Sequence, residues 1–135
     1  MRDRHDYDGA CYDGAPDCIA SARAFAGDFL SRVGAGGGTP VPVSAVATAK
    51  LVVSELVTNA CKYAPGPCLL DLEVVGELME ISVWDTNPAL PVARAAEPGR
   101  VGQHGLEIVL AVCEGFEVRR RPVGKRIKVC VSLDQ

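Results

Sequence analysis

Residues 54–64, SELVTNACKYA, carry three polar side chains at helical spacing within an otherwise apolar segment. Glu55 and Asn59 are four residues apart, and Lys62 follows three residues later, so a helix would turn all three into one narrow sector. A carboxylate, a carboxamide and an ammonium group on one face can hold a polar ligand. An amphipathic helix shows the same kinds of residue on its solvated face, so both interpretations stay open at this point.

Two other short segments could also bind a ligand. The apolar segment 81–85, ISVWD, predicts a strand that brings Asp85 to its carboxyl end, immediately before a long loop, where binding groups are commonly found. The same aspartate could simply form a turn. The segment 102–109, GQHGLEIV, places Gly102 and Gly105 at the start of a predicted helix, where free backbone amides and the helix dipole favour an anion such as phosphate.

Two helices are predicted in the first half of the chain. Residues 17–33 have apolar side chains at helical spacing and begin with Asp17, an expected N-terminal cap. The glycine- and proline-rich residues 34–42 are expected to end that helix and form a linker. Residues 44–64 predict the long helix that carries the polar side chains. Its expected core stripe comprises Val46, Ala49, Val53, Leu56 and Ala60.

Two hairpins are predicted in the second half. Residues 68–75 and 78–85 show strand-type apolarity around a two-residue turn that contains glycine. Residues 116–121 and 125–133, joined through PVG, predict a second hairpin that closes the chain.

Between the hairpins, residues 86–103 show no clear period and predict a functional loop or lid. Residues 104–115 predict a third helix that ends at Gly115. Helices and strands are grouped rather than strictly alternating. The expected fold class is therefore α+β, a two-layer α/β sandwich with a mixed sheet and helices on one face.

Length and composition indicate one soluble domain. The chain has 135 residues, of which 48% are hydrophobic and 23% charged, an ordinary globular composition. We expect a flexible tail at 1–14, which could add an edge strand near ACY, and a single domain at 15–135. The net charge of −3 provides no overall positive field for nucleic acid or anionic lipid. The basic residues 119–128 are expected on the solvent side of a hairpin rather than in a binding patch.

The expected location is the cytoplasm, without a membrane partner. No apolar run reaches the roughly 18 residues of a membrane-spanning helix, and the first residues lack the apolar region of a secretion signal. The six cysteines contain no C-x-x-C pair, so neither a zinc site nor a thioredoxin-like motif is indicated. In a reducing compartment, most are expected to be small core residues.

Taken together and in this order, the segments ELVTNACKYA, WDTNPALP and GQHGLEIV resemble the N, G1 and G2 boxes of the histidine-kinase-like ATPases. The resemblance runs from about residue 17 to residue 133, and the N box is its most specific part. The family's usual G1 box is D-x-G-x-G, whereas this chain has Asn87 and Pro88 after the aspartate and no glycine. The small size and the absence of a phosphoacceptor-helix domain look like the anti-sigma-factor serine kinases and related stand-alone ATP-binding regulators of actinobacteria.

This resemblance implies a site for ATP and Mg²⁺. Asn59 would hold the magnesium ion, and Glu55, one helical turn earlier, would act as general base on the attacking hydroxyl. Asp85 would accept a hydrogen bond from the adenine amino group, and Lys62 would lie near the phosphates. The other expected nucleotide-binding residues are Asn87, Gly102, His104, Gly105 and Leu106.

The leading hypothesis from this resemblance is a serine/threonine protein kinase of the anti-sigma-factor type. Such a protein would phosphorylate an anti-sigma antagonist protein and sequester a sigma factor, without direct contact to nucleic acid, and could form a homodimer. The alternative is a non-catalytic module in which ATP orders the lid and so controls partner docking. An α+β protein without a ligand is a third interpretation that the residues leave open.

Overall fold

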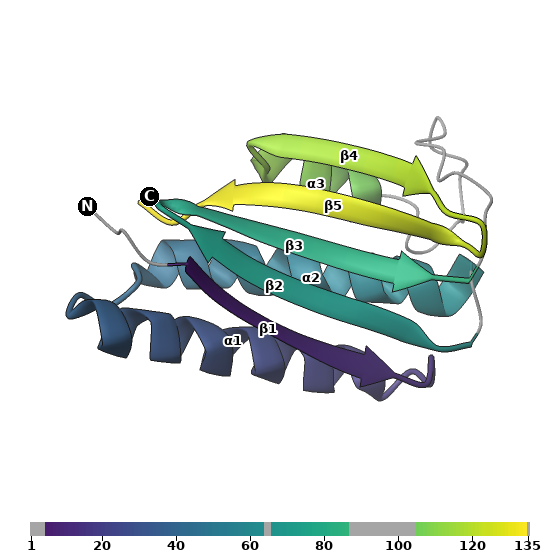
Figure 1. Ribbon diagram of the computed structural model, residues 1–135, viewed down its shortest axis with the longest axis horizontal. Coiled ribbons are helices and arrows are strands. Elements are labelled where there is room, and N and C mark those ends of the chain that lie inside the picture. The colour runs from purple at the N-terminus through teal and green to yellow at the C-terminus, as the bar shows by residue number, and fades with distance from the viewer. Residues whose placement is uncertain (1–4, 64–65, 87–104, 135) are drawn as a thin grey trace.

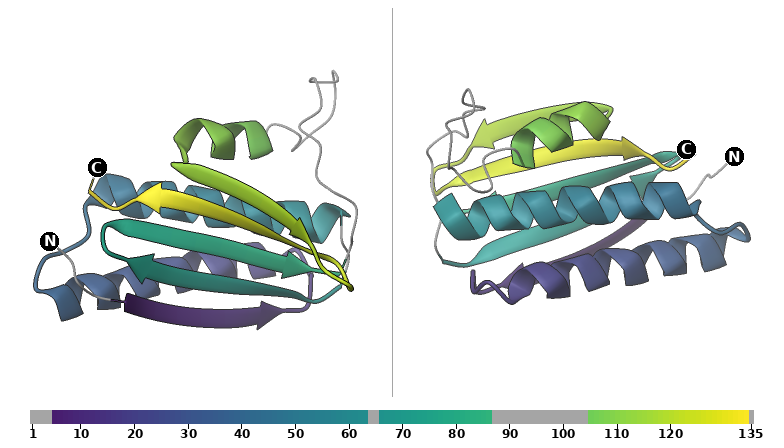
Figure 2. Two further views of the ribbon diagram at one scale, coloured as in Figure 1. Left: turned by 45° about the horizontal axis from the view of Figure 1, so that its top comes forward. Right: turned by 180° about the vertical axis from the view of Figure 1, so that it is seen from behind.

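The computed structural model describes residues 5–63, 66–86 and 105–134. Its helices are α1 (Cys18–Gly37), α2 (Val43–Tyr63) and α3 (Gly105–Val112). Its strands are β1 (His5–Tyr12), β2 (Cys68–Val75), β3 (Leu78–Asp85), β4 (Gly115–Arg120) and β5 (Lys125–Ser132). Figure 1 and Figure 2 show the strands as one layer, with the three helices together on one of its faces. The predicted two-layer α+β sandwich is confirmed.

The sheet has the strand order β1-β2-β3-β5-β4, and each of these neighbouring pairs is antiparallel. The expectation of a mixed sheet is therefore wrong for the strands that the structure describes. The helix pair explains the first antiparallel pairing. Helix α1 carries the chain away from the end of β1 and α2 brings it back, so β2 starts beside the end of β1 (Figure 1).

The core lies between the sheet and the helices because residues alternate between the two faces of each central strand. The residues of β2, β3 and β5 that face the helices are fully or almost fully buried, which is worth roughly 1.5–3 kcal/mol for each large apolar side chain. They include Leu70, Leu72, Val74, Met79, Ile81, Val83, Ile127, Val129 and Val131. The strand bounds 68–75 and 78–85 agree with the prediction, and Gly76 takes a positive φ of 62° in the turn between them.

Helix α2 supplies the central apolar surface above the sheet. Four of its five predicted core residues are buried, while Val46 is half-buried against the core. The helix also buries Ala45, Val52 and Val57, because it packs against α1 as well as against the sheet. By length and composition alone, residues 43–62 could cross a membrane. A core helix passes the same test, and the packing of α2 explains its apolar composition.

Helix α1 differs from its prediction at both ends. It continues through the glycines at 34, 36 and 37, which were expected to form a linker, and ends at Gly38 with φ 77°. Gly34 is buried close to Pro40 and Val41, where an added Cβ atom would lie 3.1 Å from the Pro40 Cα, so glycine suits this close tertiary contact of the helix. At the other end, Asp17 occupies the predicted N-cap position but makes no side-chain capping hydrogen bond.

Two further segments differ from their predictions. The strand β1 occupies eight residues of the segment 1–14, so the possible edge strand near ACY extends well beyond those three residues, in a segment that was expected to be a flexible tail. Gly115 was expected to end the third helix, but α3 ends at Val112 and Gly115 begins β4. There the backbone of Glu114 already donates to the Cys130 carbonyl at 2.7 Å, which starts the strand pairing.

The start of β1 and the end of β5 lie at the same end of the sheet. His5 is opposite Val75, and Ser132 is opposite Leu78, so both lie beside the turn at 76–77. The Leu133 amide donates a hydrogen bond to the Glu77 carbonyl at 2.8 Å and fixes this end. Asp85, the last residue of β3, lies at the opposite end of the sheet.

The turn between β4 and β5 packs against the end of β3. Gly124 has φ 86°, and a Cβ atom there would lie 1.7 Å from the Asp85 carbonyl oxygen. The same atom would lie 2.7 Å from the Thr86 Cα. This turn therefore needs glycine both for its backbone conformation and for its contact with β3.

We predict that Gly124→Ala destabilises the protein more than Gly38→Ala does. Both glycines have positive φ, but nothing lies within 4 Å of a Cβ atom added at Gly38. Gly38→Ala should cost about 1–2 kcal/mol for the left-handed conformation, and Gly124→Ala should add about 1–3 kcal/mol for the overlap with β3. Urea unfolding of both variants measures the difference. Equal losses would show that the β4–β5 turn moves away from β3 without cost.

Candidate functional site

Glu55 and Asn59 of α2 lie on the side of the helix away from α1. Lys50 packs on Gly27 of α1, and Glu55 is turned by about 140° around α2 from Lys50. Figure 2, in the view from behind, shows α2 between α1 and α3, so the side with Glu55 and Asn59 is the side toward α3. Glu55 and Asn59 are half-buried there, and Lys62 is exposed.

Neither Glu55 nor Asn59 has a side-chain hydrogen bond or ion pair with another residue of the described chain. Both side chains are partly buried, whereas side chains on a fully solvated helix face would be exposed. A half-buried carboxylate and amide one turn apart can therefore take a ligand without first breaking a contact with a described residue.

The end of α2 and the end of β3 lie at the same edge of the molecule. Helix α2 ends at Tyr63, and β2 begins at Cys68, a separation that limits their distance to about 18 Å. The start of β2 pairs with the end of β3, with Leu69 opposite Trp84. The sequence-predicted residues Asn59, Lys62 and Asp85 are thus brought to one edge by this connection.

Asp85 forms a buried ion pair with Lys125. Its Oδ2 atom lies 2.8 Å from the Lys125 Nζ atom, and the two side chains are 1% and 2% exposed. The residues are directly opposite each other in the pairing of β3 with β5. Both continue the buried alternation of their strands, after Val83 on β3 and before Ile127 on β5. The ion pair therefore ends the apolar core at the edge that carries the predicted site.

Lys125 was missed by the sequence-based interpretation, which placed residues 119–128 on the solvent side of a hairpin. That interpretation is correct for Arg119 and Arg120, which are exposed, and wrong for Lys125. The alternation along KRIKVCV contained a signal, because Lys125 is in phase with Ile127 and the following core residues. Its charge alone suggested the solvent side.

The other face of the same edge is polar and carries a group of aromatic and charged side chains. Asp71 accepts hydrogen bonds from the Trp84 indole at 2.8 Å and the Tyr7 hydroxyl at 2.7 Å, and the latter bond raises the pKa of Tyr7. The guanidinium groups of Arg121 and Arg126 lie 4.7 and 5.2 Å from the Trp84 ring centre. The basic side chains of this face are thus held by partners of the sheet itself.

The segment before α1 packs against the end of α2 and the connection that follows it. A side chain at Gly14 would meet the backbone of Gly66 at 2.4 Å, so the segment before α1 touches the connection between α2 and β2. Next to it, Cys18 and Cys61 place their sulfur atoms 3.5 Å apart. The start of α1 is therefore fixed beside the end of α2.

Two of the remaining predicted nucleotide contacts lie at the start of α3. Gly105 is the first residue of that helix and Leu106 the second, within one residue of the predicted start at 104. Asn87, Gly102 and His104 lie outside the described residues, as do nearly all of the predicted lid at 86–103. Val109 is buried and belongs to the core, which anchors α3 to the rest of the domain.

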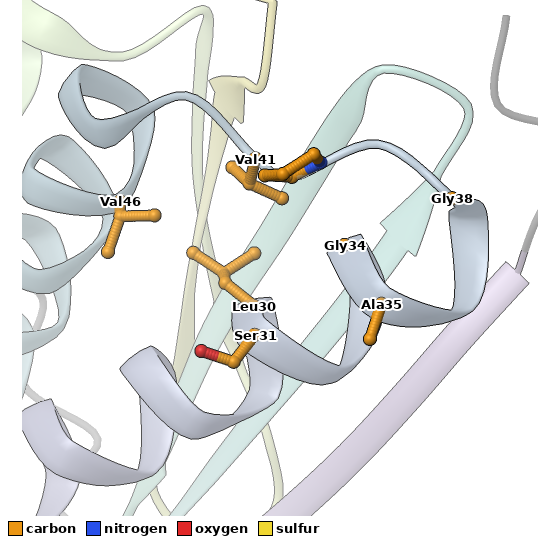
Figure 3. A pocket seen from close by; sticks show the side chains of 8 residues that line it. Leu30, Ser31, Gly34, Ala35, Gly38, Val41 and Val46 are labelled. Carbon is orange, nitrogen blue, oxygen red and sulfur yellow. The ribbon is translucent and has the colours of Figure 1, made fainter.

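A pocket of 430 Å³ lies at the opposite end of the helix pair (Figure 3). Its lining includes Leu30 of α1, Val41 of the following loop and Val46 of α2. Because the start of α1 lies beside Cys61, the end of α1 with this pocket lies away from the Asp85 edge. The pocket is separate from the predicted nucleotide site.

The donor set at α2 fits a magnesium ion. Among the described residues, no group of three or more histidine, cysteine or acidic side chains could hold a metal. Mg²⁺ needs less from a protein, because it binds one or two protein oxygens and completes its coordination with phosphate oxygens and water. The amide oxygen of the half-buried Asn59 would supply one such ligand.

A protein-family model for the histidine kinase-like ATPase domain matches residues 14–131. The chain belongs to this family. ATP is the ligand that membership in an ATPase family implies. No curated protein matches the chain.

Solved structures agree with the ATPase fold. A structure with the RsbU and RsbW domains of Rv1364c from Mycobacterium tuberculosis is similar over 95% of this chain and 32% of that chain, with a TM-score of 0.70 and 18% identity. This chain thus spans about a third of that protein. The histidine kinase domain of the blue-light activated kinase EL346 from Erythrobacter litoralis gives a TM-score of 0.52, with 20% identity over 84% of this chain and 62% of that one.

A third similar structure is the histidine kinase AdeS of Acinetobacter baumannii, with a TM-score of 0.51 and 12% identity over 95% of this chain and 68% of that one. At these identities the three likenesses establish the fold.

We predict that Cys61 and Cys68 of this ATPase domain react slowly with alkylating reagents. Burial is the main factor that raises the pKa of Cys61 to about 12 and that of Cys68 to about 11. The reactive thiolate is then roughly 10⁻⁴ and 10⁻³ of each group at pH 8, and should increase about tenfold per pH unit. Iodoacetamide labelling followed by peptide mass spectrometry should modify the exposed Cys11 first. Equal labelling rates for Cys11 and Cys61 would contradict this prediction.

Proposed function

We propose that the chain binds ATP with Mg²⁺ and transfers the γ-phosphate to a serine or threonine hydroxyl of a partner protein. The observation that carries the proposal is the half-buried pair of Glu55 and Asn59 on α2, at the edge of the sheet where β3 ends in Asp85. Membership in the histidine kinase-like ATPase family supports ATP as the ligand.

The proposed binding residues contribute different interactions. Asn59 would hold Mg²⁺ through its amide oxygen, and the ion, when bound, neutralises charge on the phosphate oxygens. Asp85 would accept a hydrogen bond from the adenine amino group, whereas guanine presents a carbonyl oxygen at that position. Lys62, exposed near the end of α2, would add positive charge near the phosphates.

The proposed transfer is a substitution at phosphorus. The oxygen of the substrate hydroxyl forms a bond to the γ-phosphorus, the bond from that phosphorus to the β–γ bridging oxygen breaks, and ADP leaves. Glu55 would take the proton of the attacking hydroxyl as general base. The products are ADP and a phosphoserine or phosphothreonine on the partner.

The proposed acceptor is an anti-sigma antagonist protein, and the proposed sequestered partner is a sigma factor. The likeness to a structure with an RsbW domain supports this choice. Under this proposal the protein works in the cytoplasm and can form a homodimer. It then acts on transcription through its protein partners and contacts neither nucleic acid nor membrane.

We predict that two substitutions on α2 separate binding from chemistry. Asn59→Ala should reduce both Mg-ATP affinity and phosphoryl transfer, because it removes a magnesium ligand in the ground state as well as the transition state. Glu55→Ala should leave Mg-ATP affinity within a few-fold and reduce transfer by roughly 10²–10⁴-fold. Calorimetry measures the binding, and transfer of labelled γ-phosphate to proteins that co-purify with the parent measures the reaction.

Lys50→Ala, on the α1 side of the same helix, is the matched control and should change neither quantity. If Glu55→Ala and Asn59→Ala both bind and react like the parent, the polar residues are only the solvated side of α2 and the kinase proposal is wrong. A parent that binds Mg-ATP but phosphorylates no partner would instead favour the non-catalytic module.

A further prediction concerns how the site recognises adenine. Asp85→Asn should weaken ATP binding by about tenfold or more, because a charged acceptor is replaced by an amide that can present its own NH₂ group to the adenine amino group. The parent should bind GTP poorly. Competition calorimetry with the two nucleotides tests both statements, and equal affinities of the parent for ATP and GTP would exclude the adenine role of Asp85.

A further inference from the structure

The Asp85–Lys125 ion pair ends an otherwise apolar stripe of the core. Removing two charges from water is costly, and well-packed apolar residues of similar size usually stabilise a fold as well or better. Stability alone therefore does not explain why this position carries charges. A site that must present an ionised carboxylate at the end of β3 does require them.

Lys125 determines how Asp85 can form hydrogen bonds. An ionised carboxylate only accepts, and its two oxygens have about four acceptor positions, so it can serve Lys125 and a ligand together. A buried carboxyl group without a counter-charge favours the protonated form, which also donates. The ammonium group lies 2.8 Å from Oδ2 and can only donate, so the carboxylate meets it as an acceptor. Cys68 also interacts with Asp85, but burial raises the pKa of this thiol to about 11, so it stays neutral.

The backbone holds Lys125 in place for this role. Lys125 is opposite Asp85 in the strand pairing, and the preceding Gly124 packs directly on the Asp85 carbonyl. The lysine side chain is 2% exposed, so it is enclosed by the protein rather than extended into solvent. Its ammonium group thus has a defined position relative to the carboxylate.

We propose that Lys125 is a positioning residue that sets the base specificity of the nucleotide site. Its ammonium group can only donate, so it orients the Asp85 carboxylate as an acceptor, and the site takes a purine with an amino group, adenine, in preference to a purine that lacks this group. The proposal rests on the proposed function, because it assumes that Asp85 contacts the base.

The test compares ATP with purine riboside triphosphate, which differs only in lacking the 6-amino group. The parent should bind ATP at least about tenfold more tightly, as expected for one hydrogen bond to a charged group. Lys125→Met should reduce this preference to within about threefold, and Lys125→Arg should retain it because the charge is kept. Calorimetry with each nucleotide gives the ratio, and thermal unfolding of each variant confirms that it is folded.

Lys128→Met is the matched control. Lys128 lies on the same strand, and its Nζ atom pairs with Glu80 at 2.8 Å on the solvent face of the sheet. The substitution therefore removes an ion-paired lysine without touching Asp85. The ratio of ATP to analogue affinity should equal that of the parent, so a change confined to Lys125→Met identifies the Asp85 contact rather than general destabilisation.

A comparison within the Asp85→Asn background remains valid even if Lys125→Met alone does not fold. If Lys125 acts through Asp85, then adding Lys125→Met to Asp85→Asn should not change the ratio further. A further loss in the double variant, or an unchanged ratio in a folded Lys125→Met variant, overturns the role of Lys125 but leaves the proposed function standing. Absence of ATP binding by the parent overturns the proposed function, and with it the role of Lys125.

Discussion

The register between β3 and β5 is the constraint on which the candidate site depends. It buries Met79, Ile81 and Val83 against the helices, together with the facing residues of β5. Since alternate residues face the same side of a sheet, the same register must also turn Asp85 and Lys125 toward the helices. A slip by one residue would expose the apolar side chains and separate the charges. Core packing and the position of the carboxylate therefore cannot vary independently.

The helices complete the site because they pack on the same face of the sheet. Helix α2 uses one side for the sheet and another for α1, and the side that remains carries Glu55 and Asn59. The polar groups of the sheet's other face, such as Lys128 and Glu80, are 27% and 26% exposed and contribute little to stability. The two faces thus divide their roles, with the potential chemistry on the covered face and solubility on the open one.

Local patterns predicted most of the fold. The hairpin at 68–85 was predicted to the residue, because strand alternation and a glycine turn are both local signals. The glycines at the end of α1 were misjudged, because their helical state depends on a contact of Gly34 with Pro40 that helix propensity does not contain. The sheet was expected to be mixed, since grouping of elements does not specify strand direction.

The candidate site was predicted only in part, because local patterns do not contain contacts between distant residues. Glu55, Asn59 and Asp85 could be found from spacing and from a family resemblance that three short segments carry. The alternation of Lys125 with Ile127 indicates the core side of the strand, but the pairing of Lys125 with Asp85, 40 positions earlier in the sequence, follows only from the strand register. The roles of the residues at 87–104 stay predictions.

The two outer ends of the described chain have a consequence for how this domain can be connected to others. His5 and Ser132 both lie beside the turn at 76–77, and Figure 1 shows the start of β1 and the end of β5 on the side away from the β4–β5 turn. A domain fused to either end would therefore extend away from the edge that carries Asp85 and leave it open to ligand and partner. The same proximity would let a short peptide join the old ends in a circular permutant, with new ends opened in the α1–α2 loop.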